Sequence, residues 1–216
     1  MEEVRLGVGA RSVTASLHGA GASALVLGHG AGGNRRSPFL VRCAEAVAAS
    51  GRSVLLHNFP YSENRRKVPD PPAVLEETTR AAVQAAAALG AARVVAGGKS
   101  MGGRIASQAV ASGTRVDGLV FLGYPLHAPG RPERLRDRHL DAIDVPMLFL
   151  QGTRDAFARW DLIEGVAARL GKRATLVRID GADHSFAVPK REGRDGREIE
   201  AALFQEIVAW LAARGL

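Results

Sequence analysis

Short runs of apolar residues recur along this chain and alternate with longer segments whose apolar residues follow helical spacing. Two of these runs, Ala24–Leu27 and Leu119–Leu122, contain no polar residue. Strands that are apolar throughout are covered on both faces, which is typical of a parallel sheet between layers of helices. Strands and helical segments in this order predict an α/β domain with a mostly parallel, doubly wound sheet.

The same reading gives bounds for the individual elements. The expected strands are Val13–Leu17, Ala24–Leu27, Val54–Leu56, Arg93–Ala96, Leu119–Leu122, Met147–Leu150 and Thr175–Ile179. Helices are expected at 39–47, at 73–90, around Ile105 and Ala109, at Leu162–Leu170 and at Ile199–Leu211, and the charged stretch Pro189–Arg197 predicts a surface loop. Domains average about 100–200 residues, so residues 1–216 are expected to form one domain.

Composition excludes several classes of protein. Hydrophobic residues make up 46% and charged residues 24%, which is ordinary for a folded globule and argues against disorder. The single cysteine, Cys43, excludes an intrachain disulfide. The acidic start Met1-Glu2-Glu3 lacks the features of a signal peptide, and no apolar run is long enough to span a membrane. We therefore expect a cytoplasmic protein with no membrane partner.

The net charge of +7 raises the question of a nucleic-acid partner. Arginines gather in small groups at Arg35-Arg36, at Arg65–Lys67 and at Arg131–Arg138, and none of these groups is interleaved with aromatic residues. Basic patches that bind nucleic acid are usually larger and more continuous. The charge thus predicts a solvated, arginine-rich surface, and no nucleic-acid partner is expected.

The strongest motif is Gly98–Gly102, which reads G-x-S-x-G between a predicted strand and a predicted helix. A nucleophilic serine needs a sharp turn that lifts its Oγ above the sheet, and the flanking glycines leave room where strand and helix approach. The following helix directs its N-terminal N–H groups toward developing negative charge. Ser100 is therefore the candidate nucleophile, and a plain glycine-rich turn is the alternative.

The same residues also read GK[ST], as a phosphate-binding loop does. Such a loop needs a glycine five positions before Gly98, and that position is Arg93, inside the predicted strand. The loop is too short to wrap a phosphate, which argues against nucleotide hydrolysis.

A second glycine-rich run, Gly28–Asn34, directly follows the strand Ala24–Leu27. Such a run lets backbone N–H groups face a substrate oxygen, as an oxyanion hole requires. We expect the N–H groups of Ala31 and Met101 to form this hole, with Gly30 or Gly32 as alternatives to Ala31. A plain turn is again the other interpretation.

A serine nucleophile needs a base, and the base needs an orienting carboxylate. In a sheet of this kind ligands bind beyond the carboxyl ends of the strands, and the expected chain order is serine, acid, histidine. His184 follows the last predicted strand and Asp155 follows the strand Met147–Leu150. They are the candidate base and acid. Asp144 precedes its strand and so lies at the wrong end.

These residues resemble an α/β-hydrolase with a serine nucleophile, over nearly all of the chain from Ala24 onward. The chain is similar to small lidless members, among them dienelactone-hydrolase-like proteins and the testis-expressed and chromatin-complex-associated hydrolase-like branch. The motifs that carry the resemblance are His29–Asn34, Asn58–Tyr61, Gly98–Arg104, Gly123–His127, Gly152–Asp155 and Asp183–Phe186. True dienelactone hydrolases have a cysteine nucleophile where this chain has Ser100.

The resemblance implies an α/β-hydrolase fold in which Ser100, Asp155 and His184 form a catalytic triad that hydrolyses a carboxylic ester or related acyl bond. This chemistry needs no metal or other cofactor, and its partner is a small-molecule ester. Between Leu122 and Val145 there is room for one short helix around Arg131–Leu140, so a lid is not expected. Tyr61, Tyr124 and His127 are candidate substrate-binding residues. A homo-oligomer, and a non-catalytic binding or scaffold module on the same fold, stay open as alternatives.

Overall fold

The computed structural model describes residues 1–189 and 193–216 and contains one eight-stranded sheet with the strand order β1-β2-β4-β3-β5-β6-β7-β8. The strands are β1 (Glu2–Val8), β2 (Arg11–His18), β3 (Ser23–Gly28), β4 (Ser53–His57), β5 (Arg93–Lys99), β6 (Gly118–Leu122), β7 (Met147–Gly152) and β8 (Ala174–Ile179). Strands β1, β2 and β4 pair antiparallel, whereas β4, β3 and β5–β8 pair parallel.

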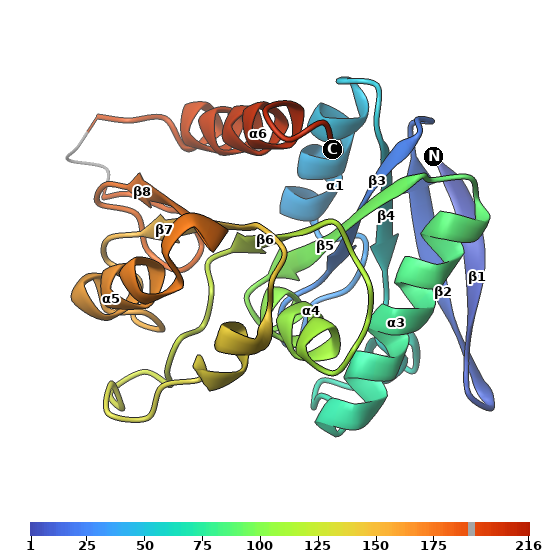
Figure 1. Cartoon of the computed structure of the whole chain (residues 1–216), viewed down its shortest axis with the longest axis horizontal. Helices are drawn as coiled ribbons and strands as arrows, with labels where there is room; N and C mark the ends of the chain where they lie inside the picture. Colours follow the sequence, from blue (N-terminus) through green and yellow to red (C-terminus); the bar gives the residue numbers. More distant parts are fainter. Residues whose placement is uncertain (190–192) are drawn as a thin grey trace.

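Helices cover both faces of this sheet (Figure 1). They are α1 (Pro38–Ala48), α2 (Pro60–Glu63), α3 (Pro72–Ala88), α4 (Met101–Ala111), α5 (Trp160–Leu170) and α6 (Gly196–Ala212), with short 3₁₀ helices η1 (Arg138–Ala142) and η2 (Gly171–Arg173). Helices α1 and α6 pack on one face, and α3, α4 and α5 pack on the other. The mostly parallel, doubly wound α/β sheet expected from the sequence is confirmed.

The central strands are apolar because neither of their faces meets water. Every residue of β6 and β7 is buried, and their side chains divide between two hydrophobic clusters, one on each side of the sheet. Phe121 and Phe149 pack toward α4 and α5, while Val120 and Leu148 pack toward α6. The alternation of side-chain direction along a strand divides one apolar run between the two cores.

Three local predictions need correction. Strand β1 was not expected, although it pairs antiparallel with β2 and buries its alternate residues Leu6 and Val8. The helix predicted around Arg131–Leu140 is the later and shorter η1. Of the predicted loop Pro189–Arg197, residues 190–192 lie outside the described part, and α6 already begins at Gly196.

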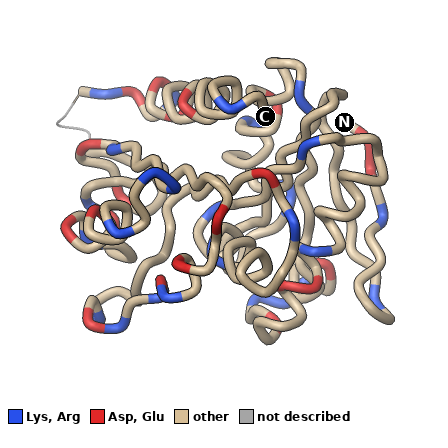
Figure 2. The backbone as a smooth tube through the Cα atoms, viewed as in Figure 1, with Lys and Arg blue, Asp and Glu red and all other residues tan. Residues whose placement is uncertain are grey.

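Charged residues lie on the outer helices and loops, with Lys and Arg interspersed among Asp and Glu (Figure 2). Several arginines are paired with carboxylates, for example Arg42 with Glu200 at 2.7 Å and Arg169 with Asp137 at 2.8 Å. None of the helices in the described part of the chain combines the length and apolar character needed to cross a membrane.

Candidate active site

Ser100 occupies the turn between β5 and α4, at the carboxyl end of the sheet. Its backbone has φ 51° and ψ −116°, a conformation that non-glycine residues rarely adopt. The turn is held by a hydrogen bond from the Ser100 N–H to the Leu122 carbonyl at 3.1 Å. Such strain is typical of a nucleophile lifted above a sheet, and it gives the G-x-S-x-G motif the structural context that it requires.

The two glycines of this motif permit the chain to cross itself beneath Ser100. A Cβ on Gly98 or on Gly102 would lie 2.2 Å from the Gly28 carbonyl oxygen, far inside contact distance. Gly98 also has φ 151°, which favours glycine. Strand β5 and helix α4 therefore pass directly against the end of β3, and this crossing brings the Gly28–Asn34 loop next to Ser100.

His184 and Asp155 meet Ser100 although they come from loops far along the chain. His184 Nε2 lies 2.8 Å from Ser100 Oγ, and His184 Nδ1 lies 2.7 Å from Asp155 Oδ2. The loops that follow β5, β7 and β8 supply these three side chains, because the carboxyl ends of parallel strands share one edge of the sheet. The ring of Phe157 packs on the imidazole with a centroid separation of 4.3 Å.

Asp155 is held by more than its histidine. Its side chain is fully buried, Oδ1 accepts the Phe157 N–H at 2.7 Å, and Oδ2 accepts the Gln151 Nε2–H at 2.6 Å. Gln151 is in turn fixed by the Tyr124 N–H, which donates to its Oε1 at 2.8 Å. Sequence reasoning missed Gln151, although a polar residue near the end of the apolar strand β7 was a visible signal.

The Gly28–Asn34 loop places Ala31 beside the candidate nucleophile. The Gly32 N–H donates to Tyr61 Oη at 3.2 Å and the Gly33 N–H donates to the Gly30 carbonyl at 3.0 Å, so both of these N–H groups already have an acceptor. Ala31 lines the same cavity as Ser100 and Met101. Met101 is the first residue of α4, and the first N–H groups of a helix have no acceptor inside it.

Two buried histidines support this loop from below. His29 Nε2 accepts the Phe59 N–H at 3.2 Å, and the rings of His29 and His57 both pack edge-on against Phe59. Burial lowers the pKa of each imidazole to about 4, so both are neutral near pH 7. They act as packed core groups that bind the loop to the turn after β4.

The cavity above Ser100 has a volume of about 250 Å³. It is lined by Ala31, Pro69, Asp70, Pro72, Leu75, Ser100, Met101, Arg104, Pro125, Arg136 and Phe157. The lining residues of segment 69–75 and the two arginines were not predicted, because the wall comes from the segment that enters α3, from the first turn of α4 and from the loop before η1.

The three residues predicted to bind substrate do not line this cavity. Tyr61 is fully buried behind the Gly28–Asn34 loop, and Tyr124 packs in the core against Phe121 and Phe149 while its hydroxyl donates to the Arg136 carbonyl. His127 is also buried, and its Nε2 accepts the Arg159 N–H at 3.0 Å. All three side chains are hydrogen-bonded to backbone groups beneath the surface, whereas Phe157 lines the cavity itself.

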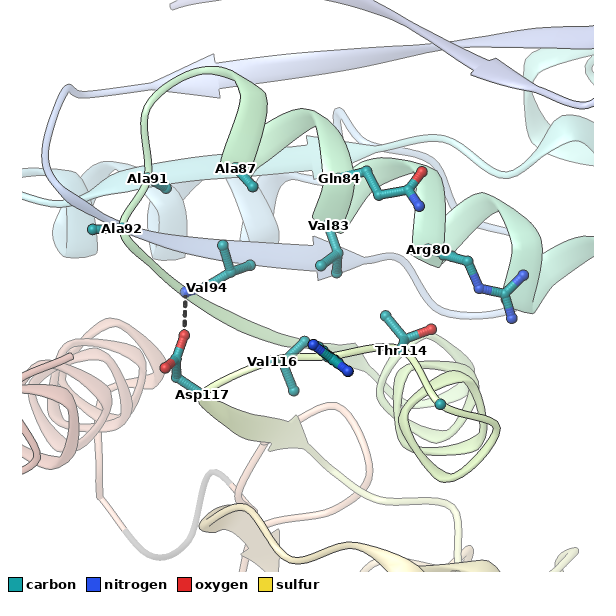
Figure 3. A pocket seen from close by; sticks show the side chains of 12 residues that line it. Arg80, Val83, Gln84, Ala87, Ala91, Ala92, Val94, Thr114, Val116 and Asp117 are labelled. Atoms are coloured by element: carbon teal, nitrogen blue, oxygen red, sulfur yellow. Dashed lines mark hydrogen bonds between the residues drawn. The ribbon is translucent and has the colours of Figure 1, made fainter.

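A second cavity, of about 480 Å³, lies at the opposite edge of the sheet (Figure 3). Side chains of α3, including Val83 and Ala87, face the start of β5 and the turn before β6 across it. Asp117 is the one acidic residue of its wall, and its carboxylate already accepts the Val94 N–H at 2.8 Å. Within the described residues, no group of three or more His, Cys, Asp or Glu side chains is placed to bind a metal ion.

Comparisons with known proteins agree with this architecture. A family model described as alpha/beta hydrolase domain matches residues 18–212. The chain is similar to a dienelactone hydrolase from Anabaena variabilis (TM-score 0.75, 24% identity, 98% of this chain and 97% of that chain covered). It is also similar to an alpha/beta serine hydrolase without lid from Xanthomonas campestris (TM-score 0.74, 18% identity, 97% and 94% covered) and to an esterase from Thermogutta terrifontis (TM-score 0.68, 22% identity, 97% and 94% covered). The chain therefore belongs to the alpha/beta hydrolase family and has the fold of its lidless serine-hydrolase members.

Proposed function

We propose that this protein hydrolyses a carboxylic ester, or a related acyl bond, through an acyl-enzyme formed on Ser100. One observation carries the proposal: a single imidazole, that of His184, lies 2.8 Å from Ser100 Oγ on one side and 2.7 Å from Asp155 Oδ2 on the other. This is the arrangement of nucleophile, base and orienting acid that acyl transfer to serine requires. The hydrolase fold of the chain supports it.

Acylation follows from these distances. His184 Nε2 accepts the Ser100 Oγ proton while Oγ attacks the carbonyl carbon of the ester. The carbonyl oxygen gains negative charge, and the N–H groups of Met101 and Ala31 stabilise it at the N-terminus of α4. His184 then donates the proton to the departing alkoxide, which leaves as an alcohol and yields the acyl-serine.

Deacylation uses the same groups with water as the nucleophile. His184 takes a proton from the water, the hydroxide attacks the acyl carbon, and the proton returns to Ser100 Oγ as the carboxylic acid leaves. Throughout the cycle Asp155 holds the imidazole in one orientation and stabilises its charged form. The three donors to the Asp155 carboxylate keep it in place for this task.

The cavity sets the size and polarity of the acyl group. At about 250 Å³ it is below the range of roughly 300–1,000 Å³ that is usual for drug-sized ligands. Its walls combine the apolar residues Leu75, Met101 and Phe157 with the charged residues Asp70, Arg104 and Arg136. We therefore expect esters of short acyl chains to be cleaved faster than those of long chains.

A serine-directed phosphonate tests the proposal directly. Wild type is expected to be labelled at Ser100 and to cleave a p-nitrophenyl ester of a short acid, whereas S100A is expected to do neither. A wild type that is neither labelled nor active on a panel of esters graded in chain length and charge would refute it. That outcome would favour a binding or scaffold module that keeps the hydrolase fold.

A further inference from the structure

Lys99 directly precedes the candidate nucleophile, and its ammonium group turns back into the site. Lys99 Nζ donates a hydrogen bond to the backbone carbonyl of His184 at 2.5 Å and lies 5.0 Å from the centroid of the Phe186 ring. One side chain thus spans from the end of β5 to the loop that follows β8. None of the steps proposed above uses it.

The end of β6 leaves space for this ammonium. Gly123 has φ 70°, and a Cβ on it would lie only 3.0 Å from Lys99 Nζ and 3.5 Å from His184 Nδ1. A larger residue at this position would push against both the lysine and the imidazole. The ends of β5, β6 and β8 therefore converge on one partly buried cation beside the proposed base.

The surroundings of Lys99 disfavour the charged form of its side chain. Burial lowers the pKa of Lys99 to about 8, although the charges of Asp155 and Asp183 oppose the shift. Within the described residues no carboxylate oxygen lies at ion-pair distance from Nζ. The partly buried ammonium therefore depends on one carbonyl, one aromatic face and the longer-range field of the two aspartates. A lysine at the surface, or an apolar residue here, would avoid this cost.

The other hydrogen bonds of the loop that carries His184 show why the bond from Lys99 matters. Asp183 Oδ1 accepts the N–H groups of Ser185 and Ala187, which shapes the loop, and Phe186 closes it with φ 64°. These bonds lie within the loop and do not fix it against the serine. The bond from Lys99 does, because it ties the backbone of residue 184 to the residue next to Ser100.

We propose that Lys99 is a positioning residue for the base: its ammonium holds the His184 carbonyl and thereby keeps the imidazole between Asp155 and Ser100. The inference rests on the proposed serine-hydrolase function. Misplacing a reacting group by about 1 Å can cost about 100-fold in rate. A clamp of this kind therefore affects the chemical step, while a substrate bound in the cavity above Ser100 does not contact it.

The first test replaces the ammonium with an apolar chain of similar length, K99M. We expect kcat on a short-chain p-nitrophenyl ester to fall by roughly 10- to 100-fold while KM changes little, and phosphonate labelling of Ser100 to slow by a similar factor. Wild type should also lose activity above about pH 8, where Lys99 loses its proton, and K99M should lack this alkaline limb. Loss of fold alone would lower the active fraction without changing the shape of the pH profile.

The chain permits a chemical rescue with a matched control. Cys43 is fully buried and burial raises the pKa of its thiol to about 12, so it resists alkylation in the folded protein. K99C treated with 2-bromoethylamine gains an aminoethyl thioether of lysine's length, and K99C treated with iodoethane gains the same thioether without the amine. Wild type treated with each reagent checks that Cys43 stays unmodified.

We expect the aminoethyl form to recover most of the kcat and the alkaline limb, and the ethyl form to recover neither. The inference is overturned if K99M keeps the wild-type kcat and pH profile, or if the ethyl and aminoethyl forms are equally active. In both cases wild-type labelling and ester cleavage would leave the proposed function standing. A wild type that is neither labelled nor active would remove the function and the inference together.

Discussion

Two aspartates accept backbone N–H groups at opposite edges of the same sheet, and only one of them faces a nucleophile. Asp155 binds the Phe157 N–H at 2.7 Å beside a cavity of about 250 Å³, and Asp117 binds the Val94 N–H at 2.8 Å beside a larger cavity of about 480 Å³ (Figure 3). The smaller cavity lies at the carboxyl ends of the strands, where Ser100, His184 and the N-terminus of α4 converge. The proposed chemistry therefore lies where strand direction places it, and not at the larger of the two cavities.

Asparagine substitution of these two aspartates makes the sharpest test of this comparison. D155N keeps the shape of the site but presents the wrong hydrogen-bonding group to His184, and we expect kcat to fall about ten-thousandfold. D117N should leave kcat unchanged, since its carboxylate only fixes the start of β5. Ester hydrolysis by the two purified variants measures both effects. Equal rates for D155N and D117N would contradict the assignment of the acid.

The second prediction concerns the close crossing of backbone beneath Ser100. A Cβ on Gly102 would lie 2.2 Å from the Gly28 carbonyl, whereas Gly165, also helical, has nothing within 4 Å. We expect G102A to lower the free energy of unfolding by several kcal/mol, on the order of other overpacked cores. G165A should raise it by about 0.5–1 kcal/mol, because alanine is the better helix former. Urea denaturation of both variants gives the sign; destabilisation by both would leave the close crossing unsupported.

The sequence located Ser100, Asp155 and His184 because each follows a buried apolar strand, and parallel strands place their carboxyl ends together. It did not reveal which way a side chain turns after its strand. Tyr61, Tyr124 and His127 also follow strands, yet they turn beneath the surface and bind backbone groups. Cavity-lining residues such as Leu75 and Arg136 belong to other segments, whose position depends on how α3 and η1 pack. Strand β1 escaped prediction although its apolar residues Val4, Leu6 and Val8 alternate with Arg5 and Gly7, as in a strand with one exposed face.

The third prediction extends the comparison to pH, because the two imidazoles whose pKa burial lowers to about 4, those of His29 and His57, lie beneath the edge of the proposed active site. The pKa of His57 is about 4 when folded against an ordinary 6.5, so between these values the unfolded chain binds a proton that the folded chain does not. The free energy of unfolding should therefore fall as pH drops from 6.5 to 4, by about 3 kcal/mol for this one group.

H57Q removes this proton while it leaves His29 in place. Its free energy of unfolding, measured in urea from pH 4 to 7.5, should depend less steeply on pH than that of wild type. The two slopes of unfolding free energy against pH should differ by the contribution of one bound proton, which is about 1.4 kcal/mol per pH unit within that range. Parallel slopes for the two proteins would show that His57 is not held neutral by burial.

The smallest effect is expected at the opposite edge, where the wall of the larger cavity includes a buried hydroxyl. Among the described residues, Thr114 Oγ1 has no hydrogen-bond partner, so T114V removes an unsatisfied polar atom without changing the shape of the side chain. We expect the free energy of unfolding to rise by about 1 kcal/mol or less and ester hydrolysis to stay at the wild-type rate. T175V is the matched control, since Thr175 Oγ1 accepts the Trp210 Nε1–H at 3.2 Å and its loss should lower stability by about 1 kcal/mol. The contrary outcome is that T114V destabilises the protein as much as T175V does, or slows hydrolysis. Either result would show that the Thr114 hydroxyl contributes to stability or activity, and that the two edges of the sheet differ less than their geometry indicates.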